Sequence, residues 1–129
     1  MTTTLTAPPS LARLYAKAAL TAPLHRGDAL PDTTYELAPQ PIDQSHLAAY
    51  DRVCGFGFGD TLPATYLHVL AFPLQVALMT ERAFPFPLVG LVHVANAITV
   101  HRPVVVGEQV ALTVRADDLR PHAAGRQLD

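Results

Sequence analysis

The residues best suited to chemistry lie between a glycine-rich loop and a long apolar segment. Residues 60–65 read Asp-Thr-Leu-Pro-Ala-Thr. A carboxylate and free backbone N–H groups at such a junction can face a bound ligand. The simpler interpretation is that Asp60 caps the element that follows, and the residues alone favour it. Asp60 is therefore the first candidate site residue, with helix capping as the alternative.

The glycine-rich loop precedes this junction, and residues 55–59 read Gly-Phe-Gly-Phe-Gly. The loop follows a predicted helix and no Walker lysine comes after it, so it does not match a phosphate-binding loop. We predict a flexible or tightly turned loop. Its side chains, Phe56 and Phe58, either cover a groove or fill the core.

Other kinds of site have little support. Neither serine, Ser10 or Ser45, lies in a nucleophile-elbow context. The single cysteine, Cys54, is expected to be a small core residue on an apolar helix face. The six histidines show no metal-ligand spacing. His93 and His101 share one side of a predicted strand but would lie roughly 26 Å apart. We therefore predict no metal site.

Length and composition limit the function classes further. The 129 residues, half of them hydrophobic, suffice for one small domain with a core. A net charge of −2 without a basic block argues against nucleic-acid binding. Residues 62–79 are too interrupted by polar residues and prolines for a membrane span. The N-terminus lacks a signal-peptide pattern and a lone cysteine allows no internal disulfide, so we expect a soluble cytoplasmic protein.

The first half of the chain must position the junction. Residues 1–9 are rich in threonine and proline and are expected to be mobile. Ser10 is expected to cap a short helix. Residues 34–37 alternate as in a strand. A second helix is predicted from Asp43, as its N-cap, to about Val53.

A buried helix follows the junction. Residues 65–81 are apolar on nearly every side, which is typical of a helix enclosed by other elements. Pro73 is best tolerated in a first turn, so we place the main helix at residues 73–82 after a looser turn.

The second half is predicted to be extended. Residues 88–101 are β-branched and predict a long strand, with Gly90 as a candidate bulge. Residues 109–117 alternate strictly and predict a second strand. Residues 122–125 predict a hairpin turn, and a further strand begins at residue 126. The pattern is that of an α+β domain with one sheet around one helix, whose last strand lacks a neighbour.

The junction and an upstream tyrosine resemble the MaoC-like hydratase/dehydratase family of hot-dog proteins. The catalytic segment of that family reads approximately Tyr, a few residues, small-Gly-Asp-x-Asn-Pro-aliphatic-His, and the central helix follows. This chain has Tyr50, a Cys-Gly pair, four extra residues at 56–59, and then the junction. Asp60 and Pro63 match the family pattern.

Two positions of the junction depart from the family. Leu62 stands at the asparagine position and Thr65 at the histidine position. In the family, the His and Asp activate the water that is added or removed, while N–H groups of the central helix polarise the thioester carbonyl. A threonine hydroxyl does not titrate near neutral pH and cannot replace the histidine as acid or base. His68 is the alternative base, although helix spacing puts it on another side of the turn.

A downstream signature adds to the resemblance, which spans residues 30–129. The family's Arg-Pro-Val-x-x-Gly-Asp/Glu motif and its preceding strand are matched by Val92-His93, Asn96 to Ile98, Arg102-Pro103-Val104 and Gly107-Glu108.

The resemblance implies an α+β hot-dog fold, an antiparallel sheet wrapped around a central helix, that is incomplete at the C-terminus. Residues 1–30 would be a leader with a short helix, and residues 31–129 the hot-dog domain. No cofactor is implied. The implied partners are an acyl thioester, carried on CoA or acyl carrier protein, and a second hot-dog domain in the same protein, a partner subunit or a homodimer.

The function implied by the resemblance is that of a supporting half. Longer members carry two hot-dogs, of which the C-terminal one holds the Asp/His pair and the N-terminal one widens the acyl groove. This chain would be the N-terminal, non-catalytic half of a dehydratase that reversibly hydrates trans-2-enoyl thioesters to (R)-3-hydroxyacyl thioesters. Its candidate acyl-groove residues are Tyr66, Leu70, Phe72, Leu74 and Met79.

Two alternatives stay open. One is a non-enzymatic hot-dog that scaffolds a catalytic partner or binds acyl groups. The other is a hot-dog thioesterase, in which Asp60 would activate water against the thioester carbonyl.

Overall fold

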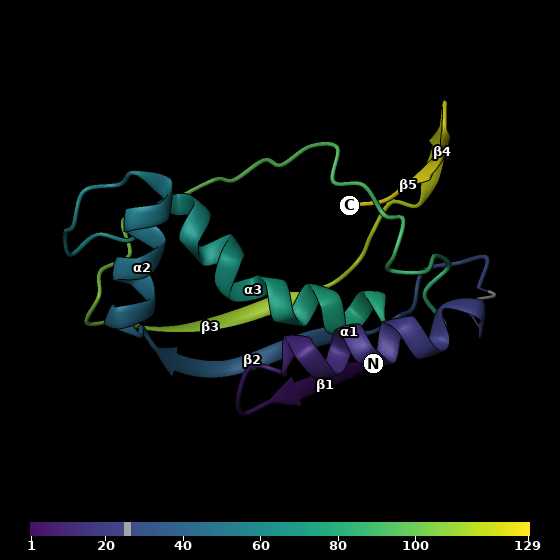
Figure 1. Ribbon diagram of the computed structural model, residues 1–129, viewed down its shortest axis with the longest axis horizontal. Coiled ribbons are helices and arrows are strands. Elements are labelled where there is room, and N and C mark those ends of the chain that lie inside the picture. The colour runs from purple at the N-terminus through teal and green to yellow at the C-terminus, as the bar shows by residue number, and fades with distance from the viewer. Residues whose placement is uncertain (25–26) are drawn as a thin grey trace.

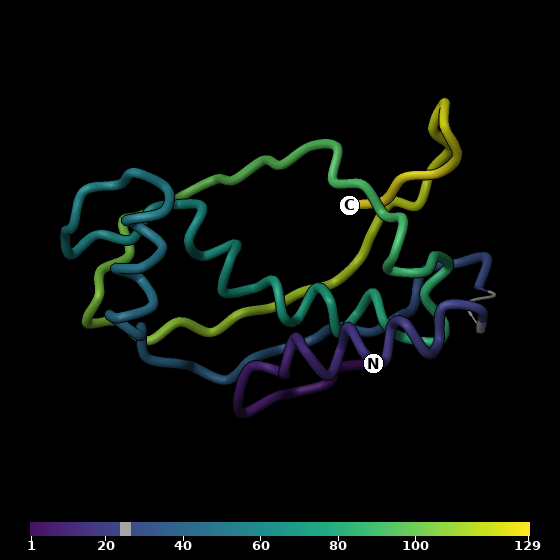
Figure 2. The backbone as a smooth tube through the Cα atoms, in the orientation of Figure 1, coloured from purple at the N-terminus to yellow at the C-terminus, as the bar shows by residue number. Residues whose placement is uncertain are grey.

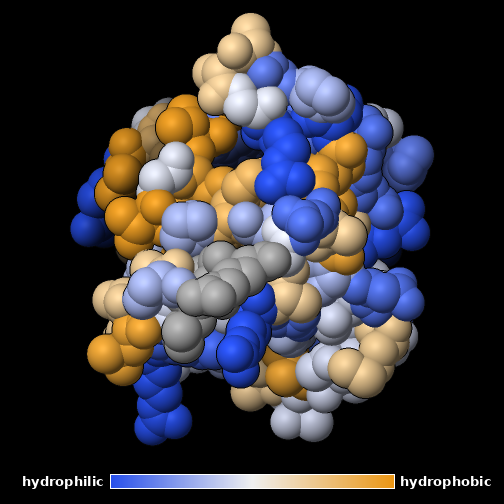
Figure 3. All heavy atoms as spheres, turned by 90° about the vertical axis from the view of Figure 1, so that its right-hand side faces the viewer, coloured by the Kyte–Doolittle hydropathy of each residue, from blue (hydrophilic) through white to orange (hydrophobic). Residues whose placement is uncertain are grey.

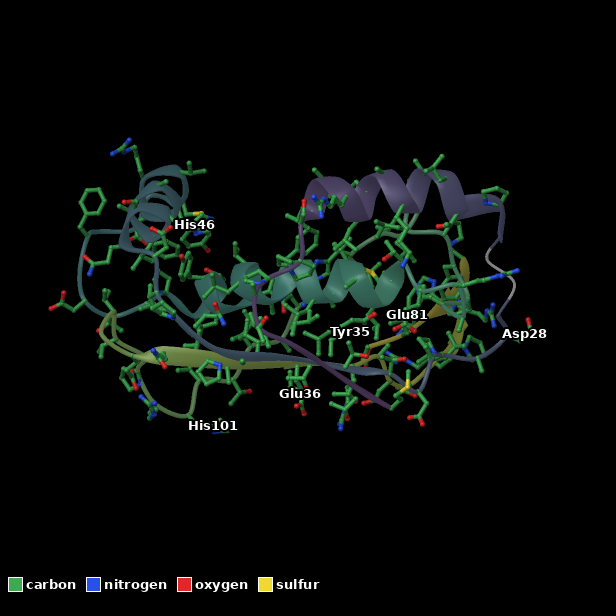
Figure 4. The ribbon with its side chains drawn as sticks, turned by 90° about the horizontal axis from the view of Figure 1, so that it is seen from below. Asp28, Tyr35, Glu36, His46, Glu81 and His101 are labelled. Carbon is green, nitrogen blue, oxygen red and sulfur yellow. The ribbon has the colours of Figure 1, made fainter. Side chains whose placement is uncertain are left out.

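The computed structural model describes residues 1–24 and 27–129, with α3 lying between a three-stranded sheet on one side and α1 on the other (Figures 1 and 4). In chain order the elements are β1 (Thr2–Leu5), α1 (Leu11–Thr21), the short 3-10 helix η1 (Ala22–Leu24), β2 (Thr34–Pro41), α2 (Gln44–Cys54), α3 (Ala64–Met79), β3 (Gln109–Val114), β4 (Arg120–His122) and β5 (Gly125–Gln127). The predicted α+β class is confirmed.

The main sheet has the order β1-β2-β3. Strands β2 and β3 are antiparallel, with Tyr35 opposite Val114, whereas β1 runs parallel to β2. The prediction that residues 1–9 are mobile is wrong for residues 2–5, and the sheet is not purely antiparallel. The three β-branched threonines of β1 favour an extended backbone. All four residues of β1 pair with β2.

Local signals at the helix ends are confirmed. The Ser10 side chain accepts a hydrogen bond from the Arg13 N–H, and the Asp43 carboxylate accepts from the N–H groups of Ser45 and His46. At its other end α2 is closed by Gly55, whose φ of 75° is in the left-handed region that glycine adopts without strain. These caps fix where α1 and α2 begin and where the glycine-rich loop leaves α2.

The start of the main helix was predicted wrongly. Helix α3 begins at Ala64 and contains Pro73 in its interior. An interior proline costs about 3 kcal/mol. However, Tyr66, Leu74 and Val76 are fully buried on either side of it, and each such side chain contributes about 1.5–3 kcal/mol. Burial therefore outweighs the lost backbone hydrogen bond.

The predicted long strand at 88–101 is also wrong. Residues 91–101, which we call the arch, lie outside both sheets, and Figures 1 and 2 show them curving away from α3. Gly90 is not a bulge but part of a turn, where the Leu91 N–H bonds to the Leu88 carbonyl at 3.3 Å. A strand requires a neighbour for its backbone groups, and none of the described strands adjoins the arch.

The remaining strands lie where they were predicted, but the expectation that the last one lacks a neighbour is wrong, because β5 pairs with β4. Strand β3 alternates between exposed and half-buried residues, as its sequence indicated. Strands β4 and β5 form a hairpin in which His122 lies opposite Gly125. Figure 3 looks onto the end of the molecule that carries this hairpin, and hydrophobic side chains reach the surface there in several patches. Among the described helices, none combines the length and apolar character needed to cross a bilayer.

Candidate functional site

The junction is held in place by the downstream signature. The Leu62 N–H donates to the Val104 carbonyl, and the Val106 N–H donates to the Asp60 carbonyl, both at 2.8 Å. Thr61 and Val105 form the antiparallel bridge between these two bonds. The two motifs that carry the family resemblance, although more than forty residues apart in the chain, thus form one structural unit in front of α3.

An ion pair stabilises the turn inside the signature. Arg102 contacts Glu108 at 2.7 Å, and the same carboxylate accepts the Val105 N–H at 2.8 Å. The hydrogen bond from Arg102, followed by that from Val105, lowers the pKa of Glu108, and the bond to Glu108 raises the pKa of Arg102. The Arg102–Glu108 pair therefore stabilises residues 104–106 of the signature, and these residues bond to the junction.

Asp60 does not cap α3, so the favoured interpretation from sequence is wrong. Pro63 occupies the N-cap position, without a side-chain cap among the described residues. Asp60 itself is exposed. The first N–H groups of an α-helix have no partner within the helix, and at Ala64 and Thr65 these groups belong to residues that line a hollow. The first turn of α3 can therefore donate hydrogen bonds to a ligand there.

The hollow in front of α3 has a volume of about 410 Å³ and is open to solvent on one side. This volume lies within the range of small-molecule sites, about 300–1,000 Å³. Its walls are mostly apolar, with two threonine hydroxyls, and come from the glycine-rich loop, the junction and the first turn of α3. They are Phe56, Gly57, Thr61, Leu62, Pro63, Ala64 and Thr65.

The hydroxyl of Thr65, at the family's histidine position, is engaged by Tyr50. A hydrogen bond joins the Tyr50 hydroxyl to Thr65 Oγ1. The Tyr50 ring stacks on Phe56, with centroids 6.0 Å apart and planes inclined by 22°. Tyr50 was singled out in sequence by the resemblance alone, and its contact with Thr65 links α2 to the wall of the hollow.

A buried tyrosine and a surface histidine lie behind this pair. Tyr66 is fully buried, and its hydroxyl lies 2.8 Å from Nδ1 of His46 on α2 (Figure 4). Burial raises the pKa of Tyr66, and the charges of Asp43 and Asp51 raise it further. The hydrogen bond between Tyr66 and His46 joins α3 to α2, a contact between helices that sequence periodicity gave no sign of.

Three of the predicted acyl-groove residues face the interior. Tyr66, Leu70 and Leu74 recur every four residues and share one side of α3. Tyr66 and Leu74 are fully buried, and Leu70 packs against the core cluster to which Tyr66 belongs. Tyr66 and Leu70 pack in the cluster that also contains Leu47 of α2 and Val104 of the signature.

The other two lie on a different side of α3. Phe72 and Met79, seven residues apart, share a side with Thr65, which lines the hollow. Both are half-buried, and Val69, also on this side, is partly exposed. The sequence prediction thus combined residues from two sides of α3, and none of the five lines the hollow.

The alternative base and the lone cysteine lie elsewhere. The ring of His68 lies 6.0 Å from that of His93, and its Nδ1 lies 3.5 Å from Gln75 Nε2. These contacts connect His68 to the arch rather than to the hollow. Cys54 is exposed, so its prediction as a core residue is wrong. Among the described residues, no group of three or more histidine, cysteine or acidic side chains could hold a metal ion.

Comparison with known proteins agrees with the resemblance. The model of the FAS1-like dehydratase domain region matches residues 32–126. The chain is 39% identical to 3-hydroxyacyl-thioester dehydratase X of Mycobacterium tuberculosis over 126 residues, which cover 97% of this chain and 45% of that protein. The crystal structure of HtdX from Mycobacterium tuberculosis matches with a TM-score of 0.70 and 40% identity, over 74% of this chain and 41% of that one.

The chain thus spans less than half the length of each of these two relatives. The structural match confirms the predicted hot-dog fold. The family model covers most of the chain, including the junction and the signature that braces it. The chain therefore belongs to the FAS1-like dehydratase region family and is a MaoC-like hot-dog protein.

Proposed function

We propose that the chain is the non-catalytic, acyl-accommodating half of a cytoplasmic dehydratase that interconverts trans-2-enoyl and (R)-3-hydroxyacyl thioesters in fatty acid metabolism. The reaction class is supported by the 3-hydroxyacyl-thioester dehydratase that the chain resembles along 97% of its length. The non-catalytic role rests on one observation. Thr65 occupies the position of the family's histidine, and its hydroxyl is hydrogen-bonded to Tyr50.

The chemistry explains why this contact argues against catalysis. Dehydration requires a group that takes a proton from carbon and another that gives one to the departing hydroxyl. Such groups work best when their pKa lies near the working pH. A threonine hydroxyl at the position of the family's histidine is not such a group. Asp60 supplies a carboxylate, but a second titrating group would have to come from outside this chain.

Acyl binding is supported by the hollow and by the side of α3 that continues it. The N–H groups of Ala64 and Thr65 can donate to a thioester carbonyl. From Thr65, the partly exposed apolar side chains of Val69 and Phe72 extend about 10 Å along the helix, at 1.5 Å per residue. We propose Phe72 and Met79 as acyl-contacting residues, whereas Tyr66, Leu70 and Leu74 would act by shaping the core behind them.

A second hot-dog domain is the proposed partner, either in a longer protein or as a dimer, and the arch supports it. Residues 88–101 contain no charged residue, and the arch is exposed throughout, with Val92 78% and Val94 69% exposed. An apolar extended segment that belongs to neither described sheet is a site where another strand can add. In an extended backbone, Val92, Val94 and Ile98 fall on one face, which would be covered in the complex.

The test is a hydration assay with trans-2-octenoyl-CoA. It compares this chain with the gene product that includes any adjoining coding sequence, and each is assayed with and without Asp60→Ala. We expect no hydration by this chain, activity in the longer product, and a change of less than about threefold when Asp60 of this half is replaced.

Other outcomes would overturn the proposal. Hydration by this chain alone that Asp60→Ala abolishes would make it a self-sufficient enzyme. Release of CoA thiol without hydration would indicate the thioesterase alternative. A longer product that binds acyl-CoA but never reacts would indicate a scaffold.

A further inference from the structure

We propose that Phe58, at the tip of the glycine-rich loop, is a ligand-contacting residue that closes over the hollow when an acyl chain occupies it. This inference rests on the proposed function, because it takes an acyl thioester as the ligand. It adds a contact residue and a movement that the family resemblance does not supply, since residues 56–59 are extra relative to the family pattern.

The hollow needs a cover if it is to hold an acyl chain. Its walls are mostly apolar, but one side is open to water. An acyl chain resting against Phe56, Leu62 and Pro63 would leave its other side solvated, and this part of the hydrophobic stabilisation would be lost. A second apolar group that reaches the open side would recover it.

Phe58 is an exposed apolar side chain next to the wall of the hollow and is not part of that wall. It is 72% exposed, and it directly follows Gly57, which lines the hollow. Consecutive Cα atoms are about 3.8 Å apart, so the backbone of Phe58 adjoins the wall, and we expect a change of backbone torsion at residues 57–59 to bring the ring over the hollow. A single exposed phenylalanine is ordinary on a protein surface, and it is this position that gives Phe58 significance.

Both ends of the loop are fixed, which confines movement to its tip. On one side, the Phe56 N–H bonds to the Asp51 carbonyl at 2.9 Å, and the Phe56 ring stacks on Tyr50. On the other side, the Asp60 carbonyl accepts the Val106 N–H at 2.8 Å. The anchored residues hold the wall on both sides of the tip, so Gly57 is the wall residue that takes part in the movement.

The tip itself has room to move. A Cβ built at Gly57 or Gly59 would meet no heavy atom of the described residues within 4 Å. Glycine also has the widest backbone freedom of any residue. Without a ligand, closing the tip costs conformational entropy, and no new apolar contact offsets that cost. An acyl chain would supply the missing contact, so closure is expected to depend on ligand.

A single-tryptophan reporter tests the inference, because the chain contains no tryptophan. The probe is octanoyl-CoA, a saturated thioester that cannot be dehydrated. Phe58→Trp is expected to show a blue shift of emission and weaker quenching by iodide as octanoyl-CoA is added. Val53→Trp is the matched control, since Val53 is also exposed, at 86%, but does not line the hollow. Its emission is expected to stay unchanged.

Affinity gives a second measurement. By calorimetry, Phe58→Ala is expected to weaken octanoyl-CoA binding about tenfold, the effect of losing most of one apolar contact. Phe58→Leu should retain most of the affinity, and Val53→Ala should stay within about twofold.

The outcomes separate this inference from the proposed function. Saturable binding of octanoyl-CoA with no spectral shift in Phe58→Trp and no weakening in Phe58→Ala would overturn the closing movement and leave acyl binding intact. No binding of octanoyl-CoA by any of these proteins would overturn acyl binding in the proposed function, and the inference with it.

Discussion

Leu62 in the junction and Val94 in the arch are both apolar residues outside the helices and strands, yet their surroundings are opposite. Leu62 in the junction is buried and its N–H is bonded to Val104. Val94 in the arch is 69% exposed, and the arch belongs to neither sheet. Similar residue types therefore do not decide whether a segment is covered, because that depends on whether another segment presents matching backbone groups.

A carboxylate forms hydrogen bonds in each of the two segments that flank the arch. Before the arch, Glu81 accepts a hydrogen bond from Thr33 Oγ1 at 3.1 Å and lies beside Tyr35 between β2 and α3 (Figure 4). After it, Glu108 pairs with Arg102. Substitutions in the core and in the arch can thus compare how much each contributes to stability. Titration of Tyr35 and Glu108 can test the two carboxylate contacts.

The largest difference is expected in stability. Leu74→Ala should lower the free energy of unfolding by about 2–5 kcal/mol, because it opens a cavity at a fully buried position. Val94→Ala should change it by less than about 0.5 kcal/mol, because little is buried there. Urea unfolding of both variants followed by circular dichroism measures this. Similar losses in the two variants would mean that the arch packs onto the body.

The same pair of variants sharpens the proposal of a partner. In the longer gene product, Val94→Ala should become destabilising if the arch is covered there, whereas the effect of Leu74→Ala should stay the same. An unchanged, negligible effect of Val94→Ala in that product would contradict pairing along the arch.

The sequence predicted local features of the structure but not those that depend on distant segments. The caps at Ser10 and Asp43 and the alternation of β3 were predicted, because each depends on residues a few positions apart. The start of α3 was not, because the burial that compensates for Pro73 comes from elements distant in sequence. Nor was the arch, since a strand is defined by its neighbour.

The candidate site divides in the same way. Asp60, Thr65 and Tyr50 were identified from the family pattern, but His46, which contacts Tyr66 from α2, was not, because that contact joins two helices. Cys54 was misassigned because it lies at the last position of α2, where the helix surface is exposed and no longer packs against the core.

The contact between Tyr35 and Glu81, which precedes the arch, is expected to affect stability at alkaline pH. Burial raises the pKa of Tyr35 to about 12, with further contributions from the hydrogen bond to Glu81 and its charge. The unfolded chain releases this proton near the ordinary value of 10.0. The folded state therefore holds one more proton between these values. The stabilisation from Tyr35 is complete below pH 10 and is lost as pH rises through about 12.

Phenolate absorbance measures this titration. The chain has four tyrosines, and Tyr35→Phe should remove the transition with the highest midpoint. A variant curve that keeps this transition would show that Tyr35 is not enclosed between β2 and α3.

The smallest expected effect concerns the connection after the arch, at acidic pH. The hydrogen bond from Arg102 and that from the Val105 N–H lower the pKa of Glu108 below its ordinary 4.5. A depressed carboxyl pKa stabilises the fold above the unfolded value, and this stabilisation is lost as pH falls through the folded value. Arg102 is exposed and Glu108 is only half-buried, so water and salt screen the pair and its removal should change stability little.

The titration itself is a more sensitive measurement than stability. A carboxyl-carbon NMR titration of Glu108 should show a midpoint below 4.5, which moves upward in Arg102→Gln. Added salt should raise the midpoint in the wild-type chain more than in the variant, because screening acts on the ion pair and not on the Val105 hydrogen bond. Equal midpoints in the two chains would mean that Arg102 does not brace the signature, and that backbone bonds alone join the end of the arch to the junction.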